Sequence, residues 1–236
     1  MQLQAQRVIF MANKGNKRHM KSLHAPQYYG AHRKEYAYVA KQSPGRHTLG
    51  KSVPLSTAIV RLGIAGTAAE ARRAIKEGKV AVGGKPRRSP SFPVGINDII
   101  AIRGGASYTV SINEQGKVSF SDTSADTTHY KVVGKYRAKG GRIMARLHDG
   151  TVLAFKNAKD FAVGDSVLVD ANMAFKGVVP LKEGAECFII DGVHTGTKGR
   201  IAELKPGNMH TGASAIVEQA HGEKFETLVR NIIVVG

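Results

Sequence analysis

The chain has 236 residues, and its 35 lysines and arginines outnumber its 18 aspartates and glutamates, so its formal net charge is +17. A hydrophobic fraction of 42% fits a folded protein and excludes a chain that is disordered throughout. The excess of positive charge predicts a polyanionic partner. One cysteine, Cys187, excludes an intrachain disulfide framework and a multi-thiolate zinc site, and it favours a reducing compartment, the cytosol.

Signals for membranes and export are absent from the sequence. No apolar run approaches the roughly 18 residues that a membrane-spanning helix needs. Residues 1–10 lack the long apolar block of a secretory signal, and the sequence MANKGNKRHMK from Met11 reads like a second protein start. We therefore expect neither export nor a membrane partner, and we give residues 1–10 no structural role.

The positive charge is concentrated towards the N-terminus. Residues 1–51 contain 10 basic and 1 acidic residue, residues 52–103 contain 9 and 3, and residues 104–236 contain 16 and 14. The net charges of the three segments are therefore +9, +6 and +2. Since solubility alone does not require such a gradient, the polyanion is expected to bind the N-terminal half.

Residues 11–51 show no sustained period of 2 or 3.6, and they are rich in basic residues, glycine and proline. We expect this segment to be poorly ordered alone and to fold against its partner. The interleaved tyrosines favour RNA over a merely solubilising basic tail, because aromatic rings offer stacking platforms for unpaired bases. The candidate RNA-binding residues of the segment are Lys14, Lys17, Arg18, His19, Lys21, His24, Tyr28, Tyr29, Arg33, Lys34, Arg46 and Lys51.

Residues 52–103 have the pattern of a small mixed α/β domain. After Ser52, with Pro54 expected in the first helical turn, apolar residues recur at helical spacing until Gly63. Thr67-Ala68-Ala69-Glu70 is a capping box for a second helix that ends at Gly78. Strands are predicted at 79–82 and 96–102, with a glycine turn and a basic run between them.

One face of the predicted second helix is basic, and further basic residues follow it. Guanidinium groups fork onto phosphate oxygens, and ammonium groups act as point charges, so this set suits an RNA backbone. The alternative is an ordinary solvated helix face. The candidate residues of this patch are Arg72, Arg73, Lys76, Lys79, Lys85, Arg87 and Arg88.

From Ala106 onward the pattern consists of short strands separated by turn signals such as Asp149-Gly150. Many short strands predict small barrels. The predicted strands are 108–112, 117–120, 130–136, 142–148, 151–156, 166–169, 187–190, 200–204, 215–219 and 224–235.

Catalytic and metal motifs are not found. There is no phosphate-binding P-loop, dinucleotide fingerprint, nucleophile elbow, zinc-protease motif or Cys-x-x-Cys. Nine histidines do not form a persuasive metal site, since several lie in the basic segment, so no metal and no cofactor are expected. Asp149, Asp165 and Asp170 occupy turn or strand-end contexts in which aspartate is common for backbone reasons, and we assign them no catalytic role.

Two segments resemble known RNA-binding elements. Residues 52–100, SVPLSTAIVRLGIAGTAAEARRAIKEGKVAVGGKPRRSPSFPVGINDII, resemble the S-four type RNA-binding domain. Residues 186–204, ECFIIDGVHTGTKGRIAEL, are similar to the KOW element, a strand, a glycine loop and a second strand. The likeness implies that Lys198 and Arg200 face phosphate. Asp191 and Glu186 make this hairpin less basic than the N-terminal half.

The chain resembles the S-four-e family of small-subunit ribosomal proteins of archaea and eukaryotes in the order of these elements. The resemblance covers about residues 11–236 and includes the C-terminal sequence HGEKFETLVRNIIVVG. The length of the chain is closer to that of the archaeal members. The resemblance implies a non-catalytic, cytoplasmic constituent of the ribosome whose partners are small-subunit ribosomal RNA and neighbouring ribosomal proteins. The implied α+β architecture comprises an extended basic N-terminal extension (1–51), an S-four-like domain (52–103), a central β domain (104–180) and a KOW-like β-barrel domain (181–236).

Two other functions remain open at this point. An RNA-modifying enzyme such as a pseudouridine synthase can carry an S-four targeting module, but the C-terminal half lacks a catalytic aspartate in a G-R-L-D context. A KOW-bearing transcription factor would bind RNA polymerase instead.

Overall fold

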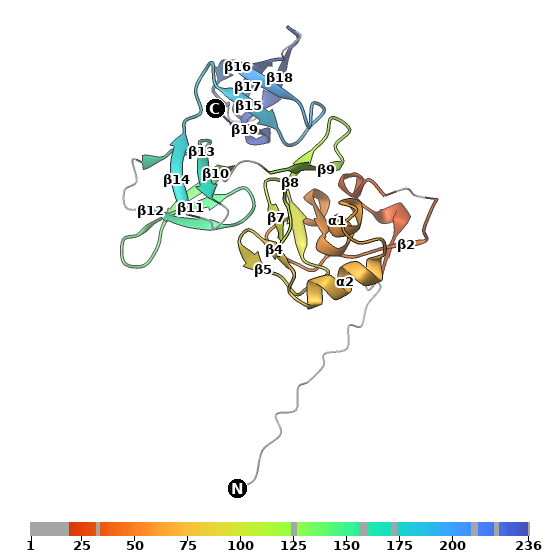
Figure 1. Ribbon diagram of the computed structural model, residues 1–236. Coiled ribbons are helices and arrows are strands. Elements are labelled where there is room, and N and C mark those ends of the chain that lie inside the picture. Colours follow the sequence, from red (N-terminus) through yellow and green to blue (C-terminus); the bar gives the residue numbers. More distant parts are fainter. Residues whose placement is uncertain are drawn as a thin grey trace.

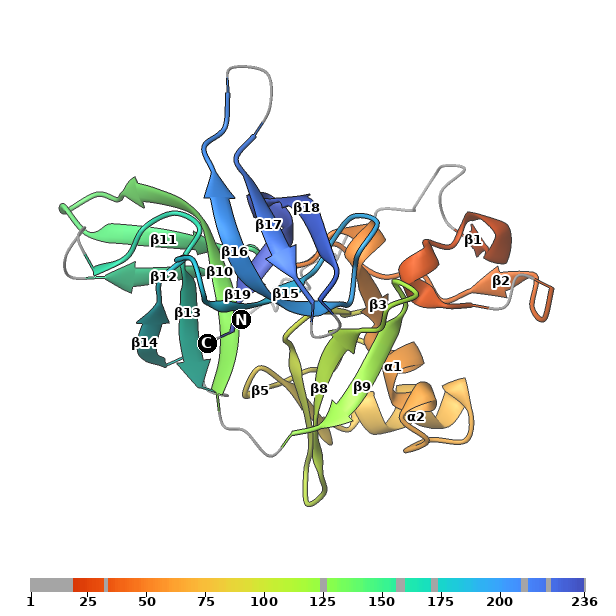
Figure 2. The same cartoon turned by 90° about the horizontal axis from the view of Figure 1, so that it is seen from above.

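The computed structural model describes seven stretches of the chain, namely residues 19–31, 34–123, 127–155, 160–170, 174–208, 212–219 and 222–235. Within them the protein has two α-helices, both in the N-terminal half, and three five-stranded antiparallel sheets that follow one another along the chain. Figures 1 and 2 show one sheet with both helices and two further β-units beside it. The α+β class predicted from the sequence is confirmed.

The helix–sheet unit, residues 52–122, combines two helices with a sheet in the order β5-β4-β7-β8-β9. Strands β3 and β6 form a separate antiparallel pair. The helices are α1 (Leu55–Arg61) and α2 (Ala68–Lys76), and the strands are β3 (Ser52–Pro54), β4 (Val80–Val82), β5 (Lys85–Pro86), β6 (Pro93–Gly95), β7 (Ile99–Ile102), β8 (Ser107–Ile112) and β9 (Val118–Asp122).

The extent of this sheet corrects one predicted boundary. Strands β8 and β9 form a hairpin, and β8 also pairs with β7 through Ile99 with Thr109 and Ile100 with Tyr108. The boundary that we expected after residue 103 therefore cuts through one sheet. Charge composition changes at that point, but the edge of β7 still needs a hydrogen-bonded neighbour, and β8 supplies it.

Local sequence signals explain where the helices begin and end. The hydroxyl of Thr67 accepts a hydrogen bond from the Glu70 amide at 3.2 Å, and the Glu70 carboxylate accepts one from the Gly66 amide at 3.0 Å. Gly78, with φ of +76°, follows the end of α2 in the left-handed conformation. The capping box and both helices are confirmed, but Pro54 ends β3 with an extended backbone instead of lying inside the first helical turn.

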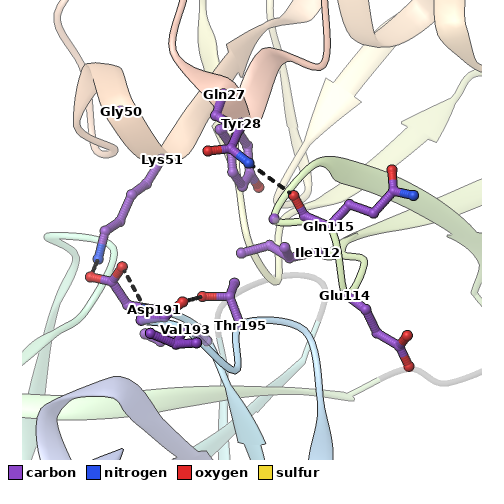
Figure 3. Close-up of a pocket in the computed structure, with 13 residues that line it drawn as sticks. Gln27, Tyr28, Gly50, Lys51, Ile112, Glu114, Gln115, Asp191, Val193 and Thr195 are labelled. Carbon is purple, nitrogen blue, oxygen red and sulfur yellow. Dashed lines mark hydrogen bonds and ion pairs between the residues drawn. The ribbon is translucent and has the colours of Figure 1, made fainter.

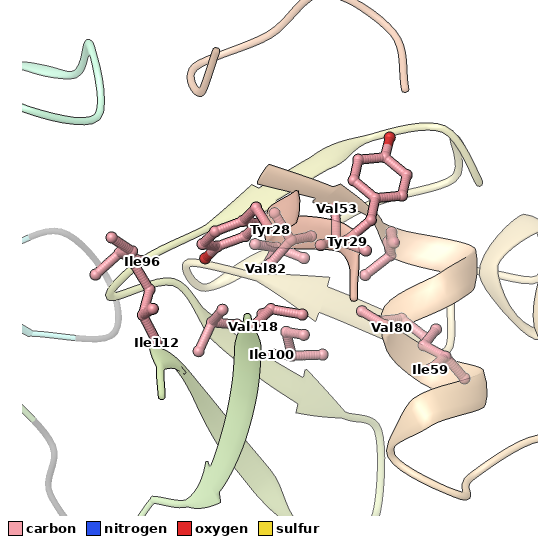
Figure 4. Packing of buried hydrophobic residues seen from close by; sticks show 14 of the residues in the cluster. Tyr28, Tyr29, Val53, Ile59, Val80, Val82, Ile96, Ile100, Ile112 and Val118 are labelled. Atoms are coloured by element: carbon pink, nitrogen blue, oxygen red, sulfur yellow. The ribbon is translucent and has the colours of Figure 1, made fainter. Parts of the chain in front are cut away.

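The N-terminal segment, residues 19–51, packs against the helix–sheet unit. It forms a short antiparallel pair of β1 (Met20–Lys21) and β2 (Tyr38–Val39) and three 3-10 turns, at Ser22–His24, Gln27–Tyr29 and Leu49–Lys51. Tyr28 and Tyr29 are buried in the same core as Ile59 and Ile100, as Figure 4 shows. The described residues of this segment thus have a packing contact that the sequence did not predict, because the tyrosines provide apolar surface that the helix–sheet unit covers.

The central β-unit, residues 127–179, is a sheet in the order β12-β11-β10-β13-β14. Its long strand β10 pairs with β13 through its first half and with β11 through its second half, with a bulge at Val133 between them. Tyr130, Val132 and Leu147 belong to its core. The strands are β10 (Thr127–Arg137), β11 (Ile143–Leu147), β12 (Val152–Phe155), β13 (Ser166–Asp170) and β14 (Phe175–Val179), of which the sequence prediction missed β14.

The C-terminal β-unit, residues 186–234, is a sheet in the order β18-β17-β16-β15-β19 around Ile201, Val217 and Val234. The predicted strand 224–235 is interrupted by a 3-10 turn at Val229–Asn231. This turn lets the last strand cross to β15. The strands are β15 (Glu186–Ile189), β16 (Lys198–Lys205), β17 (Ser214–Glu218), β18 (Lys224–Leu228) and β19 (Ile232–Val234).

Buried polar groups join the three units. The ammonium group of Lys131, in the central β-unit, donates to the carbonyl oxygens of Val229 and Ile232 in the C-terminal β-unit, the second at 2.8 Å. Asp98 and Asp149 likewise bring the helix–sheet unit and the central β-unit to a shared partner, Arg46.

None of the helices in the described stretches has the length and apolar character needed to cross a membrane.

Candidate nucleic-acid interface

Helix α2 presents a basic face to solvent. Ala71 and Ile75 are fully buried against the core, so the opposite side of the helix is exposed. That side carries Arg72, Arg73 and Lys76, which line a shallow groove with Ala69 and Glu77. The structure thus separates a packing side of α2, with Ala71 and Ile75, from the predicted basic side.

One acidic residue neutralises part of this face. Glu77 pairs with Lys79 at 2.7 Å and with Arg73 at 3.1 Å. Hydrogen bonds from Lys79 and Arg73 hold the pKa of the Glu77 carboxyl below its usual value. Arg72 and Lys76 have no acidic partner among the described residues, so they are the cations of α2 that are available for a phosphate.

The basic run after β4 lies next to the end of α2. A Cβ atom on Gly78 would lie 3.7 Å from Nε of Arg88, so this side chain passes close to the C-terminus of the helix. Arg87 turns inward instead, and its guanidinium lies 4.4 Å from the centre of the Phe92 ring. Lys85 is exposed on β5. The structure thus groups Lys85 and Arg88 with the face of α2, while Arg87 supports the fold.

The described basic residues of the N-terminal segment are mostly exposed. His19, Lys21, His24 and Lys34 lie at the surface, and the His19 ring makes an edge contact with Tyr38 at 5.9 Å. Four further predicted RNA-binding residues lie outside the described stretches: Lys14, Lys17, Arg18 and Arg33.

The prediction that Tyr28 and Tyr29 stack on bases is wrong. Their side chains are 5% and 1% exposed and belong to the hydrophobic core. Burial raises the pKa of the Tyr29 hydroxyl to about 12. Tyr36 and Tyr38 are instead 66% and 60% exposed, so these two rings are the ones that a base can reach. Composition alone did not separate the two pairs, because all four tyrosines lie in the same basic context.

Arg46 also has a structural position and not the predicted phosphate-binding one. Its guanidinium pairs with Asp98 and with Asp149, whose side chains are both fully buried, the second at 3.3 Å. Burial by itself raises the pKa of Asp98, but the charges and hydrogen bonds of His47 and Arg46 outweigh it, and the pKa is lowered. Two buried carboxylates therefore share this one cation, and removing it would leave both without their guanidinium partner.

Lys51 joins the N-terminal segment to the C-terminal β-unit. Its ammonium group lies 2.6 Å from the Asp191 carboxylate, at one side of a cleft of about 570 Å³ that Gln115 and Val193 also line. Figure 3 shows Lys51 and Asp191 in contact at one side of this cleft. The hydrogen bond from Lys51 holds the pKa of Asp191 below its usual value. Lys51, predicted to bind RNA, is thus already paired with a carboxylate.

Lys198 and Arg200 are exposed on β16 of the C-terminal β-unit. Arg200 lies opposite Glu186 on one neighbouring strand and opposite Glu218 on the other. Two carboxylates beside Arg200 lower the local positive potential, so this hairpin is less suited to phosphate than α2 is.

The predicted backbone roles of Asp149 and Asp165 have direct contacts to support them. Asp149 accepts hydrogen bonds from the amide and hydroxyl of Thr151, and Asp165 accepts from the amides of Ala162 and Leu181. In the part of the chain that the structure describes, no three histidine, cysteine, aspartate or glutamate side chains are grouped as metal ligands are. Burial raises the pKa of the Cys187 thiol to about 11, which makes this cysteine a poor nucleophile.

Comparison with known proteins begins with the domains. Residues 53–100 match the S4 domain, and residues 14–50 match the RS4NT (NUC023) domain. The fold and the basic face of α2 thus define an S4-domain protein.

Relatives cover nearly the whole chain. It is 33% identical to small ribosomal subunit protein eS4 of Methanothermobacter thermautotrophicus, over 96% of this chain and 95% of that protein. It is 34% identical to the eS4 protein of Methanococcus vannielii, over 96% and 97% of the two chains. The chain belongs to the small ribosomal subunit protein eS4 family.

A solved structure agrees with this assignment. The crystal structure of the 30S ribosomal protein S4e from Thermoplasma acidophilum is similar with a TM-score of 0.65 and 29% identity, covering 79% of this chain and 95% of that one. The predicted family is confirmed. These relatives are named as small ribosomal subunit proteins, which favours the predicted non-catalytic family over the alternative of an RNA-modifying enzyme.

Proposed function

We propose that this protein is a structural constituent of the cytoplasmic small ribosomal subunit, in which it binds and stabilises ribosomal RNA and adjoins neighbouring ribosomal proteins. The observation that carries the proposal is the group of four exposed cations at α2 and the following turn. Arg72, Lys76, Lys85 and Arg88 have no acidic partner among the described residues. An unpaired group of this kind is what counterion release from an RNA backbone requires.

The N-terminal segment would extend the same contact. His19, Lys21, His24 and Lys34 are exposed, and the Tyr38 ring beside His19 offers a stacking surface for an unpaired base. Lys14, Lys17, Arg18 and Arg33 are assigned to RNA from their charge alone. Lys198 and Arg200 would add a weaker contact from the C-terminal β-unit, because acidic residues flank Arg200.

The test measures the affinity of the full chain for archaeal small-subunit ribosomal RNA across a series of salt concentrations. The variant Arg72→Ala/Lys76→Ala/Arg88→Ala removes three unpaired cations. Each phosphate contact contributes about −0.7 to −0.9 to the slope of log K against log salt, so the magnitude of the slope should fall by about 2 to 3. Binding at low salt should weaken accordingly.

A matched control, Lys176→Ala/Lys205→Ala/Lys224→Ala, removes three lysines that each face a carboxylate. The change in net charge is identical, but the lost cations are already compensated, so affinity and slope should stay near those of the unaltered chain. Equal effects of the two triple variants would show that only total charge matters. No binding of the unaltered chain at low salt would overturn the proposal.

A further inference from the structure

The nearly neutral charge of the C-terminal half conceals one strongly basic hairpin. Residues 104–236 have 16 basic and 14 acidic residues, but residues 127–148 contain six basic residues and no acidic one. The remaining residues of that half therefore have 10 basic and 14 acidic residues, a net charge of −4 against +6 in the hairpin region. A local charge of this size is unlike the even mixture of signs on an ordinary solvated surface.

The bulge at Val133 decides which side chains of this hairpin face solvent. Before the bulge, Tyr130 and Val132 point into the core, where Val132 lies opposite Leu147. After it, Lys135 lies opposite the fully buried Ala145, so Gly134 and Tyr136 are on the outer face. Without the extra residue, Tyr136 would share the core face of Tyr130. It is instead 48% exposed.

Arg146 lies on the same outer face as Tyr136. It is directly opposite Gly134, and Tyr136 is two residues further along β10, so the two side chains are diagonal neighbours within reach of each other. A Cβ atom on Gly134 would lie 3.5 Å from Nη2 and 3.6 Å from Nε of Arg146, which shows that the guanidinium lies close against the strand. Two flat π-systems, a phenol ring and a guanidinium, are thus exposed side by side on one sheet face.

Cations without carboxylate partners lie at the tip of the same hairpin. Arg137, Lys139 and Arg142 are exposed at the tip of the hairpin, where Gly140 and Gly141 form the turn. In the described stretches none of these three cations, nor Arg146, is in an ion pair. Figures 1 and 2 both place β11 on the side of the molecule away from α2, so this surface is separate from the basic face of the S4 domain.

We infer that the outer face and the tip of the β10–β11 hairpin form a second RNA-binding surface, on which Tyr136 and Arg146 stack on unpaired bases while Arg137, Lys139 and Arg142 at the tip hold the adjoining phosphates. Exposed aromatic and guanidinium planes between cations suit a single-stranded or irregular RNA segment, because bases have π-faces and phosphates carry the charge. An acidic protein surface would use the charges but not the ring. The inference rests on the proposed function. It implies that the protein binds two separate RNA segments, one at α2 and one at the hairpin.

Three variants of the full chain test the charge and the stacking separately, with archaeal small-subunit ribosomal RNA as the probe. Arg137→Ala/Lys139→Ala/Arg142→Ala should reduce the magnitude of the salt slope by about 2 to 3. Tyr136→Leu should weaken binding about tenfold and leave the slope unchanged, because stacking does not release counterions. Tyr136→Phe keeps the ring and should bind like the unaltered chain.

Hydroxyl-radical footprinting of the RNA locates the two contacts. The hairpin triple variant should lose protection in one RNA region, and Arg72→Ala/Lys76→Ala/Arg88→Ala should lose it in another. If the hairpin triple variant and Tyr136→Leu retain normal affinity and footprint while the α2 variant binds poorly, the inference is overturned and the proposed function stands. Normal RNA binding combined with lost association with small subunits would also overturn it, in favour of an acidic protein partner. An unaltered chain that binds no RNA refutes the proposed function itself.

Discussion

Arg46 donates a hydrogen bond to Asp149 at 3.3 Å, although 103 residues separate them in the chain. The same guanidinium pairs with Asp98, which also lies 2.8 Å from Nε2 of His47. The N-terminal segment, the helix–sheet unit and the central β-unit therefore meet at one buried group of charges. Neutralising two buried carboxylates is a structural requirement that keeps this basic residue away from RNA.

Replacing Arg46 with methionine should destabilise the protein. The side chains of Asp98 and Asp149 are both fully buried, so each would lose a cation without gaining water. The free energy of unfolding should fall by about 3 kcal/mol, as measured by urea denaturation. Lys85→Ala, which removes an exposed cation of the helix–sheet unit, is the control and should change it by less than about 0.5 kcal/mol. Equal stability of the two variants would contradict the buried-pair account.

The two pairs of tyrosines should respond differently to truncation. Tyr29→Ala removes a ring that is 1% exposed and should cost about 3 to 5 kcal/mol of unfolding free energy, because it leaves a cavity in the core. Tyr38→Ala removes a ring that is 60% exposed and should leave stability nearly unchanged while RNA affinity falls. Denaturation and RNA binding are measured on both variants. Reduced stability of the Tyr38 variant with unchanged affinity would show that Tyr38 is structural.

Acidification should destabilise the protein through His148. Burial lowers the pKa of this imidazole to about 4 from its usual value of 6.5, so the unfolded chain binds a proton between these values and the folded chain does not. The free energy of unfolding therefore falls as the pH drops through this window, by about 1 to 2 kcal/mol between pH 7 and pH 5. His148→Asn keeps an acceptor for the Lys131 amide but does not titrate. Its stability should depend less on pH, and an identical pH profile would exclude His148 as the source.

Alkaline conditions should have the opposite effect through Lys131. Burial lowers the pKa of its ammonium group to about 8 from its usual value of 10.5. Above pH 8 the folded protein releases this proton while the unfolded chain retains it, so the free energy of unfolding should rise by about 1 kcal/mol between pH 7 and pH 9. The free energy of unfolding is measured by thermal or urea denaturation at each pH for the unaltered chain and for Lys131→Met. The difference between the two values isolates the contribution of Lys131 from those of the tyrosines and Cys187. A constant difference over this range would contradict it.

Local patterns predicted the helices and most strands because the deciding interactions lie within a few residues. The Thr67 cap needs only the amide of Glu70, and Gly78 needs only its own backbone freedom. Strand β14 was missed, since Phe175 to Val179 form a strand only by pairing with β13. The break in the last predicted strand, at Val229–Asn231, likewise follows from where β19 must pair.

The sequence by itself determined the family likeness, the α+β class and the basic face of α2, because charge, periodicity and capping are properties of neighbouring residues. Only the tertiary structure decided which basic and aromatic residues are available to a partner. Tyr28, Tyr29 and Arg46 are taken up by the core and by the buried carboxylates, and the bulge at Val133 turns Tyr136 outward. Burial and strand register depend on contacts between distant parts of the chain, and composition does not contain them.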